Sequence, residues 1–144
     1  LTPMASIEEY VEGRAPSSAE EIHKLRELVA DWQLLSDLSF ADLILWIPLR
    51  KDDSSWPTGY IAVAHIRPTT AATVFAHDVI GDEIRWGERF YIDQALSNGE
   101  IVRDTEPQML GDVMVKEETI PVMMGEKVIA VNSRHRNSEL MRQP

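Results

Sequence analysis

The sequence has 144 residues, a length that suits one domain whose core is large enough to fold without disulfides or metals. It contains no cysteine, which excludes disulfides, thiolate metal sites and cysteine nucleophiles. The 24 Asp and Glu residues exceed the 14 Lys and Arg residues, and the net charge of −10 disfavours nucleic acid and anionic membrane surfaces as partners. The longest apolar run, Ala41 to Leu49, is far shorter than the roughly 20 residues that span a bilayer.

The N-terminal part predicts two helices. A short one covers residues 6–12 and ends at Gly13. A long one begins near Ser17, where Ser17 and Glu20 have capping-box spacing, and continues to about Leu38. We therefore expect residues 1–16 to be an N-terminal extension and residues 17–144 to be the domain.

One face of the long predicted helix is apolar. Its main positions recur at steps of three, four and three residues, and they are Ile22, Leu25, Val29 and Trp32. This spacing fits two arrangements, in which the helix either pairs with the same helix of a second copy or docks on its own sheet.

The rest of the chain predicts strands grouped around a crossover. The nearly continuous apolar residues of 41–49 indicate a central strand buried on both faces. The further predicted elements are a strand at 60–66, a short strand at 72–76, a helix at 88–97, a brief strand at 100–103, a hairpin of 113–124 with 127–135, and the start of an exit helix at 137–142. Grouped rather than alternating elements predict an α+β fold with an antiparallel sheet.

A distinctive sequence covers the end of the long predicted helix and the start of the predicted strand at 41–49. The stretch Trp32-Gln-Leu-Leu-Ser-Asp-Leu-Ser-Phe-Ala-Asp42 resembles the N-terminal domain of the actinobacterial PdtaS-type sensor histidine kinases. Looser matches follow in the same order, at Arg67-Pro68, Thr73-Val74, Asp78 with Gly81, Pro121-Val122, Gly125, Val128 to Val131 and Arg134-His135. The resemblance implies a GAF/PAS-like fold, with a central antiparallel sheet of about five or six strands flanked by helices and a long N-terminal helix.

The same resemblance implies a function. The domain would be the signal-input domain of a cytoplasmic, homodimeric two-component histidine kinase, in which PAS and kinase domains follow in the same chain and a response regulator is phosphorylated. The sequence here has neither a phospho-accepting histidine motif nor ATP-binding Asn and Gly boxes. We therefore expect this segment to have no catalytic residues.

A GAF-like fold can hold a ligand between one face of the sheet and the crossover. The candidate lining residues are Trp46, His65, Arg67, Phe75, Trp86, Phe90, Tyr91 and Met123. For the aromatic residues core packing is the competing interpretation. Arg67 could bind an anionic ligand or pair with a loop carboxylate, Asp78 or Asp82, and His65 could ligate haem iron or be a hydrogen-bonded core residue.

No cofactor is required by the sequence, and we expect no metal site. The cysteines of bilin-binding and methionine-sulfoxide-reducing GAF domains are absent, as is the Asn-Lys-Phe-Asp-Glu signature of the cyclic-nucleotide type. The sequence therefore does not identify the ligand. The alternative function is a ligand-free dimerisation module that pairs through the Ile22, Leu25, Val29 and Trp32 face of the long helix.

Overall fold

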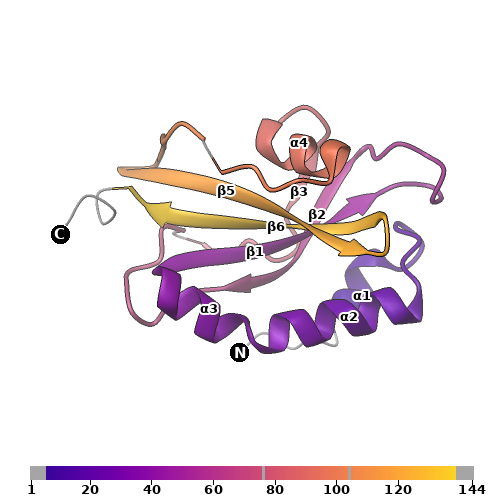
Figure 1. Ribbon diagram of the computed structural model, residues 1–144, viewed down its shortest axis with the longest axis horizontal. Coiled ribbons are helices and arrows are strands. Elements are labelled where there is room, and N and C mark those ends of the chain that lie inside the picture. The colour runs from indigo at the N-terminus through magenta and orange to yellow at the C-terminus, as the bar shows by residue number, and fades with distance from the viewer. Residues whose placement is uncertain (1–5, 76, 104, 139–144) are drawn as a thin grey trace.

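The computed structural model describes residues 6–75, 77–103 and 105–138 (Figure 1). Its elements in chain order are α1 (Ser6–Val11), α2 (Ala19–Ala30), α3 (Trp32–Ser39), β1 (Ala41–Leu49), β2 (Gly59–Ile66), β3 (Glu83–Arg85), α4 (Phe90–Asn98), β4 (Gln108–Leu110), β5 (Val113–Met124) and β6 (Lys127–Asn137). The strands form one six-stranded antiparallel sheet in the order β3-β2-β1-β6-β5-β4. The predicted α+β fold with an antiparallel sheet is confirmed.

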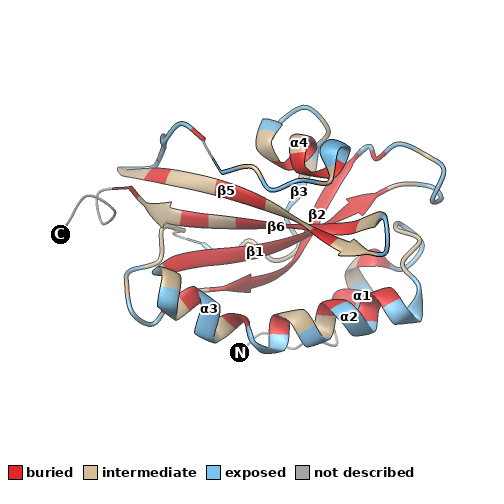
Figure 2. Cartoon of the chain, in the orientation of Figure 1, coloured by how far each residue is buried: buried red, intermediate tan, exposed pale blue. Residues whose placement is uncertain are grey.

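Strand β1 lies at the centre of the sheet and is buried along its whole length (Figure 2). Helices α1, α2 and α3 cover one face of the sheet, and α4 with the crossover covers the other (Figure 1). Because successive side chains of a strand point to opposite faces, Leu43 and Leu45 pack toward the N-terminal helices while Ile44 and Trp46 pack toward α4. This double coverage explains the unbroken apolar run of β1, as predicted.

The long helix predicted for residues 17–38 is wrong in its continuity. It is two helices separated at Asp31, whose φ of −98° and ψ of 0° end α2 and begin α3. Asp is a weak helix former, and the change of direction brings Trp32 into the core, where it is fully buried. Helix α2 is capped by Ser18, whose side chain accepts a 3.1 Å hydrogen bond from the N–H of Glu21.

Helix α1 belongs to the same core as the sheet. Ile7 and Val11 are buried in the cluster that joins α2, α3 and the first face of the sheet. The short helix assigned to the N-terminal extension therefore packs directly on the predicted 17–144 domain.

Three further details of the crossover and the C-terminal part differ from the prediction. Residues 72–75, the described part of the predicted third strand, are irregular, because Asp42 and Arg67 side chains bind their backbone and replace a ladder. The third strand lies later, at Glu83–Arg85, and the predicted strand at 100–103 is reduced to one bridge between Val102 and Thr119. Asn137, the expected start of the exit helix, ends β6, and residues 139–142 lie outside the described residues.

Candidate functional site

A buried hydrogen-bond network holds the crossover loop to the centre of the sheet. Asp42 is fully buried on β1, and its carboxylate accepts hydrogen bonds from the Thr73 hydroxyl at 2.5 Å and the Val74 N–H at 3.0 Å. His65 Nε2 on the neighbouring strand lies 2.8 Å from the same carboxylate. Arg67 donates to the Thr73 hydroxyl at 3.1 Å and the Phe75 carbonyl at 2.9 Å. These residues thus pin the loop, and Arg67 binds the loop backbone rather than Asp78 or Asp82.

A second buried network continues along the same face. The Trp46 indole N–H donates to the Ser133 hydroxyl at 2.8 Å, and His135 Nε2 lies 2.7 Å from that hydroxyl and 3.6 Å from a Glu117 carboxylate oxygen. Glu117 in turn pairs with Arg89. Burial, with smaller contributions from Arg89 and His65, lowers the pKa of His135 well below its usual value of 6.5.

Burial also acts on Glu117, in the opposite direction. It raises the pKa of the Glu117 carboxyl, although the neighbouring Arg89 opposes this shift.

The Phe75 ring lies between the two histidines, with its centroid 5.2 Å from the His65 ring and 4.9 Å from the His135 ring. The two histidine networks are thus joined by an aromatic contact.

A small cavity of about 220 Å³ borders this second network. It is lined by Phe75, Arg89, Gln108, Met109, Leu110, Val115, Glu117 and His135. Its charged groups are engaged with each other, since Arg89 pairs with Glu117, and its volume is below the usual range for ligand pockets of about 300–1,000 Å³.

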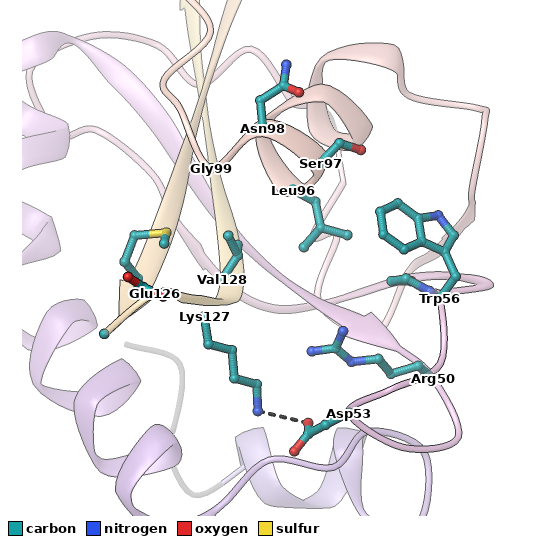
Figure 3. Close-up of a pocket in the computed structure, with 13 residues that line it drawn as sticks. Arg50, Asp53, Trp56, Leu96, Ser97, Asn98, Gly99, Glu126, Lys127 and Val128 are labelled. Carbon is teal, nitrogen blue, oxygen red and sulfur yellow. Dashed lines mark hydrogen bonds and ion pairs between the residues drawn. The ribbon is translucent and has the colours of Figure 1, made fainter.

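A larger pocket of about 530 Å³ lies between the β1–β2 loop, the C-terminal end of α4 and the β5–β6 hairpin (Figure 3). We call it the hairpin pocket. It is lined by Arg50, Asp53, Trp56, Pro57, Leu96, Ser97, Asn98, Gly99, Met123, Gly125, Glu126, Lys127 and Val128. Residues from three separate stretches of the sequence meet here because β1 and β6 are adjacent in the sheet and α4 packs across them.

The two cations of the hairpin pocket differ in their engagement. Lys127 Nζ donates to Glu21 and to Asp53, both at 2.8 Å. Burial by itself would lower the pKa of Lys127, but the hydrogen bonds to Asp53 and Glu21 raise it above the usual value. Arg50 extends toward Lys127 and Leu96 in Figure 3, and its buried Nε has no hydrogen-bond partner among the described residues. Arg50 is therefore the cation of this pocket that a ligand can engage.

The predicted lining residues do not converge on one pocket. Trp46, His65 and Arg67 belong to the buried networks, Phe75 reaches the small cavity and Met123 reaches the hairpin pocket. The other three lie apart: Trp86 packs on Trp56 and Tyr60, the Tyr91 hydroxyl accepts from the Glu106 N–H at 3.2 Å, and Phe90 is largely exposed. His65 has the hydrogen-bonded core position that was the competing interpretation to haem ligation.

The predicted dimer-helix residues also occupy the core. Ile22, Leu25, Val29 and Trp32 are all buried against the sheet, which is the docking arrangement that their spacing left open. Sequence reasoning missed Arg50, Trp56 and Lys127. The available signal was an arginine directly after an apolar strand and a tryptophan in a polar loop.

The chain is similar to known sensor kinases. The family model described as "Histidine kinase PdtaS, GAF domain" matches residues 7–144. The "Sensor histidine kinase PdtaS" of Mycolicibacterium smegmatis (strain ATCC 700084 / mc(2)155) is 34% identical over 119 residues, which are 81% of this chain and 22% of that protein. The protein of the same name from Mycobacterium tuberculosis (strain CDC 1551 / Oshkosh) is 32% identical over 123 residues, covering 83% and 23%.

The fold is also found in a solved structure described as "Sensor region of a sensor histidine kinase". The TM-score is 0.70 at 24% identity, and the match covers 100% of this chain and 46% of the other. The chain spans less than a quarter of the length of the two curated sensor kinases that it matches. None of the helices in the described ranges is long and apolar enough to cross a membrane.

Proposed function

The chain belongs to the family of PdtaS histidine kinase GAF domains, and from this premise we propose that it is a signal-input domain that binds a small ligand in the hairpin pocket. The parent protein of this proposal is a cytoplasmic protein-histidine kinase. Its PAS and kinase domains would follow in the same chain, and a response regulator would receive the phosphoryl group. The segment itself would regulate rather than catalyse.

The observation that carries the proposal is the hairpin pocket with its unengaged arginine. Its volume of about 530 Å³ lies in the range of small-molecule sites. Its walls combine apolar side chains such as Leu96 and Val128 with the charged Arg50 and Lys127. Such a mixture supplies both burial and orientation for a ligand.

The position of the pocket supports a regulatory role. It joins the loop after β1, the end of α4 and the hairpin that begins β6. A ligand that binds one arrangement of these three segments better than another shifts the domain toward that arrangement. Strand β6 is the last described strand, so a change at the hairpin acts on the strand that leads out of the sheet.

The test is native mass spectrometry of the protein purified from its host, with an optical spectrum of the same sample. We expect a reproducible additional mass that is lost in Arg50→Met but kept in Arg85→Met, a matched change of an exposed arginine outside the pocket. An unliganded protein that small-molecule extracts of the host do not stabilise would contradict ligand input through this pocket.

A second candidate function, a dimerisation module, is favoured by the outer face of α3. Leu34, Leu35 and Leu38 on α3 and Phe40 at its C-cap are each at least half exposed, so an apolar patch faces away from the sheet. We propose that a second copy of the chain covers this patch. Leu38→Glu should then convert a dimer to a monomer in light scattering, whereas Ile101→Glu, at an exposed position outside α3, should not.

A further inference from the structure

The geometry points to an aromatic monocarboxylate as the ligand of the hairpin pocket. The carboxylate would bind the Arg50 guanidinium, and the ring would lie against Trp56 and Leu96. This inference rests on the proposed function, since it names the chemical class of the ligand for the same pocket.

The need for an anion comes from Arg50. The chain has ten more acidic than basic residues, yet within the described ranges Arg50 forms no ion pair and acts on Asp53 only at longer range, lowering the pKa of that carboxyl. The neighbouring Lys127 is held by Asp53 and Glu21. The buried Arg50 Nε–H lacks an acceptor among the described residues, and a buried donor without an acceptor is costly. A carboxylate matches the planar guanidinium with two parallel hydrogen bonds. The terminal nitrogens of Arg50, which point into the pocket in Figure 3, are the donors that such a ligand would meet.

The charge of the ligand is limited by the other walls. Asp53 and Glu126 also line the pocket, and Asp53 already forms an ion pair with Lys127 (Figure 3). A ligand with several negative charges, such as a polyphosphate, would meet these carboxylates with one cation to balance it. A single carboxylate leaves the local charges paired.

The need for a flat apolar group comes from Trp56. Trp56 is 59% exposed in its polar loop, and its ring contacts Trp86 edge to face at a centroid distance of 5.0 Å. Large aromatic rings gain from stacking and from burial of their faces. Leu96 and Val128 extend this surface into the pocket, so a ring attached to the carboxylate removes apolar area from water on both sides.

The experiment is a titration of the 144-residue chain with phenylacetate, followed by amide NMR and calorimetry. Phenylacetamide removes the charge of this probe at nearly constant shape, and acetate removes its ring. We expect phenylacetate to shift the amides of Arg50, Leu96 and Lys127 and to bind at least about tenfold more tightly than either comparison compound, the factor that one charged hydrogen bond supplies.

Variants identify the groups responsible. Arg50→Met should weaken phenylacetate binding at least about tenfold and leave phenylacetamide unchanged. Trp56→Ala, at an exposed position, should weaken binding of phenylacetate but not of acetate. Arg85→Met should bind as the unaltered chain does, and each variant's amide spectrum shows directly that it is folded.

The outcomes separate this inference from the proposed function. Equal binding of phenylacetate and phenylacetamide, or of the unaltered chain and Arg50→Met, would overturn the carboxylate class while leaving a ligand pocket. Binding of a cationic compound such as phenethylamine at the same amides, with no response to phenylacetate, would also overturn it. An additional mass found in the host-purified protein that proves to be an aromatic acid would support both.

Discussion

Histidine 135 should make the protein less stable in mild acid. Its side chain is fully enclosed beside Ser133, Glu117 and Phe75, and burial holds its pKa well below the usual 6.5. The unfolded chain therefore binds a proton at pH values where the native protein does not, and stability falls as the pH drops below about 6.5. For a native pKa far below this range, the loss between about pH 7.5 and about pH 5.5 is about 1.4 kcal/mol.

Glu117 acts in the opposite direction. Its raised native pKa means that the folded protein holds a proton more tightly than the unfolded chain just above pH 4.5, so its contribution falls as the pH rises through that range. Both the unaltered chain and His135→Gln contain Glu117. Subtracting the pH dependence of one protein from that of the other therefore cancels the contribution of Glu117. Arg89, whose charge also disfavours protonation of His135, is present in both proteins.

The assay is urea unfolding at several pH values. We expect the unaltered chain to lose about 1.4 kcal/mol more than His135→Gln between about pH 7.5 and about pH 5.5. The ring-proton NMR signal of His135 in the unaltered chain provides a second measurement that needs no variant. A signal that titrates near pH 6.5, or equal pH dependence of the two proteins, would refute the reasoning.

Three other changes test the packing around the sheet, each by urea or thermal unfolding. Asp42→Ala should cost about 3–5 kcal/mol because His65, Thr73 and Val74 lose a buried acceptor, whereas Asp52→Ala, an exposed carboxylate in a loop, should cost far less. Trp32→Ala should cost about 3–5 kcal/mol by leaving a large cavity between α3 and the sheet, and an unchanged melting temperature would contradict this. Gly59→Ala should cost about 1–3 kcal/mol, because a Cβ there would lie 2.2 Å from the Ile84 carbonyl oxygen of β3, while Gly125→Ala, in open space, tests only the positive φ of its turn.

Elements with a strong local pattern could be predicted from the sequence. The apolar run of β1 indicated burial on both faces, because a strand with one face in water alternates apolar and polar residues. Strand β5 ends at Met124, directly before the turn at Gly125. Gly99, at a φ of 63°, ends α4 close to the predicted stop. In each case the residues that decide the structure lie next to one another in the chain.

The crossover could not be predicted in this way. Residues 72–75 have the β-branched and aromatic composition of a strand, but the side chains of Asp42, which is 32 residues from Val74, and of Arg67 bind their backbone. Likewise the periodicity of residues 17–38 shows one apolar face and does not reveal that the chain turns at Asp31 to bury Trp32. Tertiary contacts decided both cases.

The hairpin pocket shows the same limit for the candidate site. Two ion pairs at this pocket join Lys127 to Glu21 and to Asp53, which are 106 and 74 residues away from it in the sequence. These residues come close in space only once β1 and β6 are paired. Sequence reasoning placed the site by analogy on the sheet face beneath the crossover, where the structure has side chains paired with one another and a cavity of about 220 Å³. An arginine that the fold leaves without an acceptor is visible only in the assembled structure, and for that reason Arg50 rather than Arg67 is the residue on which ligand binding should be tested first.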